Sequence, residues 1–242
     1  SRLTAVLVGP QSPAVMDLTN LAVQSANGSE TSVPQTLNGV SLNITSVNPE
    51  GPGFLTVYAC DTQRPLASNL NFVGKDIVAN GVIAPVSAAG KVCVYSSVTT
   101  DLVVDLQGWF GGGSKFRSNV PLRLADTRFD QGSSKLTLGN ELKLKVRGVL
   151  IDTAGGRDQV SLRATAAALN VTVVNPESSG FVTVWPCESD RPLASNLNFK
   201  PGQVIANNVI APLDNSGEVC FYSSVPTDLI VDLAGYFDVN FG

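Results

Sequence analysis

The chain has no histidine among its 242 residues, and charged residues make up only 15% of it. Without histidine there is no imidazole acid or base, no Ser-His-Asp or Cys-His nucleophile system and no metal site with a histidine ligand. Carboxylate and Ser-Lys chemistries need no histidine and stay open as the enzymatic alternative. We therefore expect a non-enzymatic protein that holds no cofactor and no metal.

Positive charge is also scarce, because 16 basic residues stand against 20 acidic ones. Phosphate recognition relies on a basic field, so nucleic acid is not expected as a partner. No apolar run approaches the roughly 20 residues that span a bilayer, and no signal-peptide pattern opens the sequence. We expect a soluble, mature fragment without membrane insertion, and its 43% hydrophobic residues suffice for one or two cores.

The sequence contains a tandem repeat. Residues 42–110 align without a gap on residues 169–237 at a constant offset of 127, and about 40 of these 69 positions are identical. The longest shared run is RPLASNLNF, at Arg64–Phe72 and Arg191–Phe199. We therefore predict two homologous domains, residues 1–112 and 113–242, joined by a glycine-rich linker near residues 111–115.

Each repeat alternates apolar and polar residues with the period of a half-buried strand. In residues 101–106, Leu102, Val104 and Leu106 fall on one face, while Asp101 and Asp105 fall on the other. Further strands are expected at 41–47, 54–59, 77–86 and 92–95 and at their matches 127 residues later, with turn residues between them. The predicted fold is all-β, with two tandem antiparallel β-sandwich domains that are Ig-like or jelly-roll-like.

The start of repeat 1 is the least regular part of this pattern. Residues 14–26 fit neither the helical nor the strand period well, and we assign them to a strand. Repeat 2 has the segment RLADTR at 123–128, whose Asp-Thr-Arg element has no counterpart in repeat 1. Either repeat 1 has a substituted first strand, or its sheet borrows an edge from elsewhere.

The four cysteines are placed identically in the two repeats, with a separation of 33 between Cys60 and Cys93 and between Cys187 and Cys220. Four cysteines permit three pairings, and the repeat symmetry favours one disulfide in each domain. No C-x-x-C spacing is present, and the two cysteines of a repeat supply too few ligands for a tetrahedral zinc site. Zinc binding is therefore the weaker alternative. Disulfides persist in oxidising compartments, so we expect a secreted or cell-surface protein.

Aromatic and amide side chains recur at matched positions and offer a possible glycan site, because a ring covers sugar C–H groups while an amide binds hydroxyl groups. The alternative is structural: the aromatic rings pack and the amides bind backbone groups at a tight corner. A catalytic and a structural interpretation also compete for the aspartate pairs Asp101/Asp105 and Asp228/Asp232. The two carboxylates of each pair lie too far apart along a strand to act together in glycoside hydrolysis, so we expect them to be solvated or locally hydrogen-bonded. The candidate glycan-binding residues are Tyr58, Trp185, Asn69, Asn71, Asn196 and Asn198.

The motif order LNVT, GFVTV-x-x-C, RPLASNLNF, VC-x-YSS and DLIVDL-x-GYF resembles the tandem β-rich repeats of secreted actinobacterial proteins of the cell surface and cell wall. RLADTR is similar to the segment that opens those modules. The resemblance implies an exported, β-rich module, and it carries no catalytic residues over to this sequence.

These patterns lead to three hypotheses. The first is a non-enzymatic, secreted structural or adhesive module of the cell surface. The second is a glycan-binding module for cell-wall or other extracellular polysaccharide. The third is a filament subunit whose residues 1–9 complete the sheet of a neighbouring copy. The expected partners are accordingly other copies of the chain or a polysaccharide.

Overall fold

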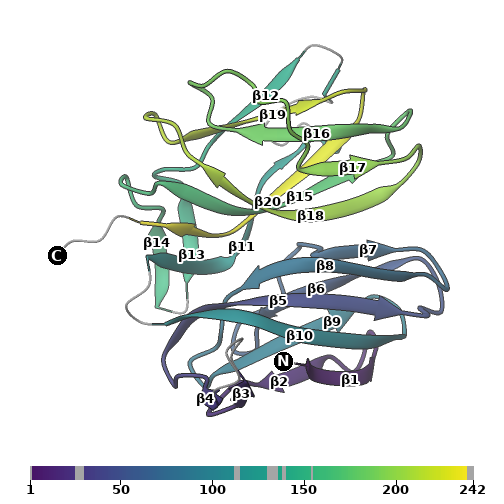
Figure 1. Ribbon diagram of the computed structural model, residues 1–242, viewed down its shortest axis with the longest axis vertical. Helices are drawn as coiled ribbons and strands as arrows, with labels where there is room; N and C mark the ends of the chain where they lie inside the picture. The colour runs from purple at the N-terminus through teal and green to yellow at the C-terminus, as the bar shows by residue number, and fades with distance from the viewer. Residues whose placement is uncertain are drawn as a thin grey trace.

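We analysed a computed structural model, which describes residues 2–24, 30–111, 115–129, 136–137, 140–153 and 155–238 (Figure 1). The main strands of repeat 1 are β1 (Arg2–Val8), β2 (Ala14–Asp17), β5 (Leu37–Val47), β6 (Gly53–Ala59), β7 (Leu70–Phe72), β8 (Ile77–Ala84), β9 (Lys91–Ser96) and β10 (Thr100–Gly111). Those of repeat 2 are β11 (Phe116–Asp126), β12 (Glu141–Lys145), β15 (Ala166–Val174), β16 (Gly180–Trp185), β17 (Leu197–Phe199), β18 (Val204–Pro212), β19 (Glu218–Ser223) and β20 (Asp228–Phe237).

Each repeat is a sandwich of two four-stranded antiparallel sheets. In repeat 1 the strand orders are β1-β10-β5-β8 and β2-β9-β6-β7, and in repeat 2 they are β11-β20-β15-β18 and β12-β19-β16-β17. Numbered 1 to 8 within each repeat, the strands follow 1-8-3-6 in one sheet and 2-7-4-5 in the other, which is the jelly-roll arrangement. The predicted all-β fold with two sandwiches is confirmed, and its topology is the jelly-roll alternative.

The alternation expected in residues 101–106 is present in β10. Leu102, Val104 and Leu106 are buried in the core of repeat 1, whereas Asp101 is exposed and Asp105 is half-buried on the other face. Apolar side chains of the two sheets meet between the layers and form one continuous core in each sandwich.

The start of repeat 1 differs from the expectation. Residues 14–24 do not form one strand, because β2 ends at Asp17 and β3 (Ala22–Gln24) pairs instead with β4 (Glu30–Ser32) in a separate two-stranded sheet. Residues 25–26 of the predicted strand lie outside the described residues. Strand β1 pairs with β10 of its own domain from Arg2 to Val8. Repeat 1 therefore has a substituted first strand, and β1 is already occupied within its own sheet rather than free to complete a neighbour's.

Repeat 2 carries two additions. A 3-10 turn, η1 (Thr127–Phe129), follows β11, and a hairpin of β13 (Leu150–Thr153) and β14 (Gly156–Gln159) lies beside β11. Among the described residues, no helix is long and apolar enough to cross a membrane.

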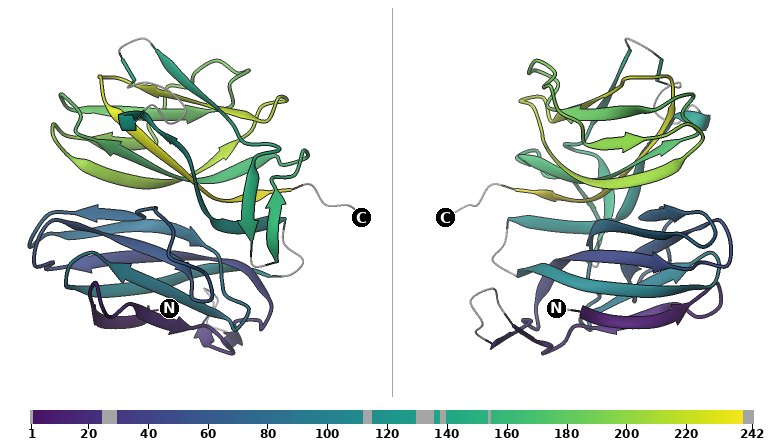
Figure 2. Two further views of the ribbon diagram at one scale, coloured as in Figure 1. Left: turned by 180° about the vertical axis from the view of Figure 1, so that it is seen from behind. Right: turned by 45° about the vertical axis from the view of Figure 1, so that its right-hand side comes forward.

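The two sandwiches are stacked with different surfaces in contact. The two views of Figure 2 and Figure 1 show the β7–β8 edge of repeat 1 beneath the sheet β11-β20-β15-β18 of repeat 2, and β18 contacts both β7 and β8. Residues 112–114 of the predicted linker lie outside the described residues. The arrangement places an edge of one domain against a sheet face of the other.

The first aromatic residue of repeat 2 fills the junction between the sandwiches. The ring of Phe116 is fully buried, with the Phe110 ring centroid 4.4 Å from its own. It packs between Ile83 of β8 and Ala168 of β15, one residue from each domain. This aromatic cluster connects the two cores at the chain crossover.

Two glycines make room for that ring. A Cβ added to Gly39 would lie 2.7 Å from a ring carbon of Phe116, and a Cβ at Gly235 would overlap the same ring. Only glycine permits so close an approach of the backbone to a neighbouring side chain. Both positions therefore serve the packing between the domains.

Candidate functional site

The disulfide pairing predicted from the repeat symmetry is confirmed. Cys60 is bonded to Cys93, and Cys187 is bonded to Cys220. Each bond links the chain just after β6 or β16 to the neighbouring strand β9 or β19. One covalent link of this kind, closing a loop of 33 residues, is worth about 3–4 kcal/mol to its domain on the chain-entropy estimate.

The amides of Asn69 and Asn196 hold a tight corner at the matched RPLAS segments. Asn69 Oδ1 accepts the backbone N–H of Val57 at 2.7 Å, and Asn196 Oδ1 accepts that of Val184 at 2.8 Å. Asn69 is almost fully buried and Asn196 is half-buried. These two candidates bind backbone groups, which is the structural alternative and not the glycan role.

The aromatic pair proposed as a sugar platform is also engaged in the fold. Trp185 is 4% exposed, and its Nε1 donates to the carbonyl of Ser189 at 3.1 Å. Tyr58, its match in repeat 1, is half-buried in β6. The expectation that Trp185 presents a solvent-facing ring is therefore wrong, because the chain after β16 packs over the indole.

The remaining two candidates lie on β7 and β17. Asn71 is half-buried and donates to Ser68 Oγ at 3.2 Å, while Asn198 is exposed. The side chains on either side of Asn71, Leu70 and Phe72, are buried, so Asn71 points away from the core. The six candidates therefore do not form one surface.

The cluster that the sequence analysis missed is centred on Arg123. Its guanidinium binds Asp232 through both carboxylate oxygens, at 2.8 Å from Nε and 3.1 Å from Nη2. Nη1 reaches Asp126 at 3.2 Å, and Nη2 also donates to the carbonyl of Leu66 at 2.8 Å. Planar, two-point recognition of a carboxylate is the strongest geometry available to arginine. One side chain thereby connects β11, β20 and the corner of repeat 1.

Asp126 bridges two arginines. It accepts Arg128 Nε at 2.8 Å and Arg128 Nη2 at 2.6 Å, in addition to its contact with Arg123. The hydrogen bonds from Arg128 hold the pKa of Asp126 below its ordinary value, against the opposing effect of burial. The same contact raises the pKa of the Arg128 guanidinium, so both groups are charged throughout the neutral range.

Of the two alternatives expected for the strand carboxylates, Asp232 is hydrogen-bonded and not solvated. It is 2% exposed, because repeat 1 covers the outer face of β20. Burial raises the pKa of Asp232, and the ion pair with Arg123 opposes that shift. Its partner along the strand, Asp228, accepts the hydroxyl of Thr127 at 2.9 Å. Neither carboxylate of this pair is free, and they serve separate local contacts.

A second contact between the domains lies next to Arg123. Asn170 on β15 donates from Nδ2 to the carbonyl of Ser68 at 2.6 Å. Arg123 and Asn170 thus bind two carbonyl groups of the same RPLAS corner. Because these hydrogen bonds are donated to backbone carbonyl groups, they fix the position of that corner without requiring any particular side chain on it.

An interdomain cleft of about 530 Å³ opens beside these contacts. Repeat 1 contributes Phe54, Arg64 and Asn71 to its walls, and repeat 2 contributes Asp126 and Arg128. Phe129, 70% exposed, completes the rim. A cleft with aromatic rings, amides and both signs of charge has the groups needed to bind a polar organic ligand.

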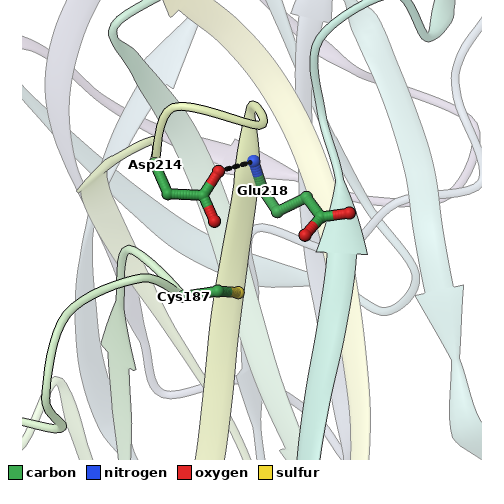
Figure 3. A group of neighbouring side chains, drawn as sticks. All are labelled: Cys187, Asp214 and Glu218. Carbon is green, nitrogen blue, oxygen red and sulfur yellow. Dashed lines mark hydrogen bonds between the residues drawn. The ribbon is translucent and has the colours of Figure 1, made fainter.

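Three further groups that could bind a metal gather at one end of repeat 2. Donor atoms of Cys187, Asp214 and Glu218 lie within 4.8 Å of one another (Figure 3). Cys187 Sγ, however, is bonded to Cys220, and Asp214 Oδ1 accepts the backbone N–H of Glu218 at 2.8 Å. A disulfide sulfur is not a thiolate ligand, so this cluster is a capped turn and not a metal site.

A signal for the missed cluster was present in the sequence. Arg123-Leu124 in repeat 2 has a counterpart in Arg2-Leu3 of repeat 1, and both arginines lie opposite the second aspartate of the DL-x-VDL motif, Asp232 or Asp105. Aligning the first strands on these arginines, and not at the offset of 127, would have paired them with the aspartates.

No protein-family model matches this sequence, and no curated protein matches it significantly. Among solved structures, the chain is similar to a protein from an archaeal virus with a triple jelly roll fold and a turret assembly, at 9% identity and a TM-score of 0.27. That match covers 97% of this chain, which spans 60% of the length of the viral chain.

Two other solved structures are similar over nearly the whole chain. The STIV MCP matches at 8% identity and a TM-score of 0.26, with 97% of each chain covered. The CBM22-1-CBM22-2 tandem domain of Paenibacillus barcinonensis Xyn10C matches at 10% identity and a TM-score of 0.24, covering 98% of this chain and 91% of that one. With all three TM-scores below 0.5, these likenesses carry no argument about function.

Proposed function

We propose that this protein is a non-enzymatic structural module that works outside the cell, with its two jelly-roll domains acting as one docked unit. The observation that carries the proposal is the contact of Arg123 with both Asp232 and the carbonyl of Leu66, which ties the repeats together. Polar groups committed to holding two domains together suit a spacer or surface component.

Two further features support an extracellular setting. Each domain has a disulfide at the same place, and such bonds persist where the environment is oxidising. The resemblance of the repeat motifs to exported actinobacterial modules agrees with this. The first hypothesis of the sequence analysis, a surface structural or adhesive module, is thus the one that we carry forward.

Location and thiol state test this proposal on the native protein. Immunogold labelling of the producing cells should place the protein on the cell surface or outside, and a thiol reagent applied without reductant should leave all four cysteines unmodified. Cytosolic labelling together with four reactive thiols would overturn it. A control with reductant added should label every cysteine.

A second candidate function is glycan binding in the interdomain cleft. It is favoured by Phe129, whose exposed ring lines the cleft together with Asn71 and has the guanidinium carbon of Arg128 5.0 Å from its centroid. An exposed ring with neighbouring amide and charged groups suits a sugar that bears an acidic substituent. Of the six residues proposed from the sequence, Asn71 is the one that lines this cleft.

Calorimetric titration with neutral and acidic oligosaccharides tests the cleft. Phe129→Ala should weaken binding at least about tenfold if the ring stacks on the sugar. The control is Arg191→Ala, which alters the repeat 2 equivalent of the cleft residue Arg64 and is not among the residues that line the cleft. Equal binding by both variants, or no binding by the unaltered protein, would remove this candidate.

A further inference from the structure

The contact between the two domains is made by two surfaces, one on each repeat. The corner surface consists of Leu66, Ser68 and Ile83 on the RPLAS corner and β8 of repeat 1. The seat surface lies on the outer face of β11, β20 and β15 in repeat 2, and its residues are Arg123, Asp232, Asn170 and Thr172. The carbonyl groups of Leu66 and Ser68 accept from Arg123 and Asn170, and Ile83 packs against Phe116 and Ala168.

Repeat 2 carries a second corner surface that none of the described residues of repeat 1 covers. Its residues are Leu193, Ser195 and Ile210, at an offset of 127 from the first corner. Ile210 is 53% exposed, whereas its match Ile83 is 5% exposed. The side chains of Leu66 and Leu193 are exposed in both corners, because the first corner is bound through the carbonyl of Leu66 and not through its side chain. The difference in burial between Ile83 and Ile210 marks the docked and the undocked copy of the same surface.

The second corner is held in the same backbone conformation as the first. Thr183 Oγ1 donates to the carbonyl of Ala194 at 2.6 Å, as Thr56 does to Ala67 at 2.7 Å. The amide of Asn207 donates to the carbonyl of Asn196 at 2.6 Å, the same distance as its repeat 1 match. The carbonyl groups of the second corner are thus presented in the way that the first corner presents them to Arg123 and Asn170.

Repeat 1 in turn carries a second seat surface. Asn43, Thr45 and Asp105 match Asn170, Thr172 and Asp232 at the offset of 127, and all three are half-buried where their matches are covered. They lie on the outer face of β5 and β10. In Figure 1 this face lies away from repeat 2, which sits over the β7–β8 edge.

The strand registers of the two seats are the same. Across β11, β20 and β15, Arg123 lies opposite Asp232, and Asp232 lies opposite Asn170. Across β1, β10 and β5, Arg2 lies opposite Asp105, and Asp105 lies opposite Asn43. A row of arginine, aspartate and asparagine over three adjacent strands is therefore present twice, and only one of the two rows has a corner docked on it.

We propose that this chain joins copies of itself head to tail, with the second corner surface of one copy docked on the second seat surface of the next. The contact reproduces the one between the two repeats. Because the two surfaces differ, each joined pair leaves one corner and one seat unused, so growth continues into a string or closes into a ring. This assembly differs from strand donation, since β1 stays in its own sheet.

The contact between copies is weaker than the one within a copy. At one end of the second seat, Ser41 and Gln107 replace the smaller Ala168 and Ala234. The repeats of one chain are also tethered, which raises their effective concentration relative to that of separate copies. Association should therefore depend strongly on protein concentration.

Sedimentation velocity with light scattering, from about 1 µM to about 1 mM protein, tests the proposal because it covers weak affinities. The average mass of the unaltered chain should rise with concentration beyond that of a dimer. Ile210→Asp disables the corner and Thr45→Arg disables the seat, both at positions outside the core, and each variant should stay monomeric. The control Leu162→Asp, at a residue 68% exposed elsewhere on repeat 2, should associate like the unaltered chain.

The mixture of the two variants is the decisive sample. Ile210→Asp retains a working seat and Thr45→Arg retains a working corner, so an equimolar mixture should form dimers and stop there. An unaltered chain that stays monomeric to about 1 mM, variants that associate like it, or a mixture without dimers would each overturn the proposal. This inference rests on the proposed structural role. Its test measures self-association and the earlier test measures location and thiol state, so either proposal can be overturned without the other.

Discussion

At the scale of single residues, burial separates side chains that the sequence makes equivalent. Asn196 and Asn198 are two positions apart in one motif, and both were candidates for sugar binding. Asn196 binds the backbone N–H of Val184, whereas Asn198 is exposed on β17. Residue type and spacing identify an amide-rich motif, but they do not tell which amide the fold itself requires.

Replacing Asn196 should therefore destabilise repeat 2 far more than replacing its neighbour. Asn196→Ala leaves the N–H of Val184 without its acceptor and should lower the free energy of unfolding by about 2 kcal/mol. Asn198→Ala should change it by about 0.5 kcal/mol or less. Urea denaturation followed by circular dichroism measures both, and equal effects would contradict the assignment of Asn196 as a structural amide.

The pKa of Asp126 predicts a pH dependence of stability. Arg128 lowers this pKa from 3.8, so unfolding raises the affinity of the group for a proton. Its contribution to the free energy of unfolding is therefore complete above the unfolded pKa of 3.8 and is lost as the pH falls through the folded pKa. We expect Asp126→Asn to be less stable than the unaltered protein by about 1–2 kcal/mol at neutral pH.

The two proteins should converge in stability as the pH falls below 3.8. Urea midpoints measured across this range check the prediction. Asp232, whose pKa is raised by burial, is present in both proteins, so its titration largely cancels in the difference. A constant difference at all pH values would show that the charge of Asp126 does not contribute.

At the scale of strands, alternation predicts correctly wherever one face meets solvent. The pattern in residues 101–106 is confirmed in β10, because water lies beyond the outer face of that sheet. The same pattern misleads in β20, where Ile230 and Asp232 are buried like the core residues Leu229, Val231 and Leu233 that alternate with them. A strand covered on both faces cannot be recognised when its second cover is another domain of the same chain.

The position of a first strand was harder to predict than its existence. Residues 2–8 form a strand that takes the same place as β11, yet only the arginine and leucine at 2–3 match 123–124 in the sequence. Pairing within a sheet needs backbone hydrogen bonds and a suitable inner face, which many sequences supply. The structural repeat therefore extends further toward the N-terminus than the sequence identity does.

At the scale of the whole molecule, the fold follows from the repeat but the docking does not. The duplicated pattern predicts two sandwiches, and the disulfide spacing predicts one covalent link in each. The contact between them depends on which edge meets which face, and no periodicity encodes that choice. Arg123 determines much of this contact, because from β11 it binds both Asp232 on β20 and the carbonyl of Leu66 on the corner.

The two arginines give a matched pair that measures this docking. Arg123→Ala removes both hydrogen bonds to the buried Asp232 and leaves its charge unpaired, which should cost about 3–5 kcal/mol. Arg2→Ala alters the position opposite the half-buried Asp105, where solvent screens the charge, and should cost about 1 kcal/mol or less. In differential scanning calorimetry, Arg123→Ala should replace the single cooperative transition of the two docked domains with two transitions, while Arg2→Ala should retain one. Equal effects of the two substitutions would mean that the Arg123 contact is not what couples the two domains.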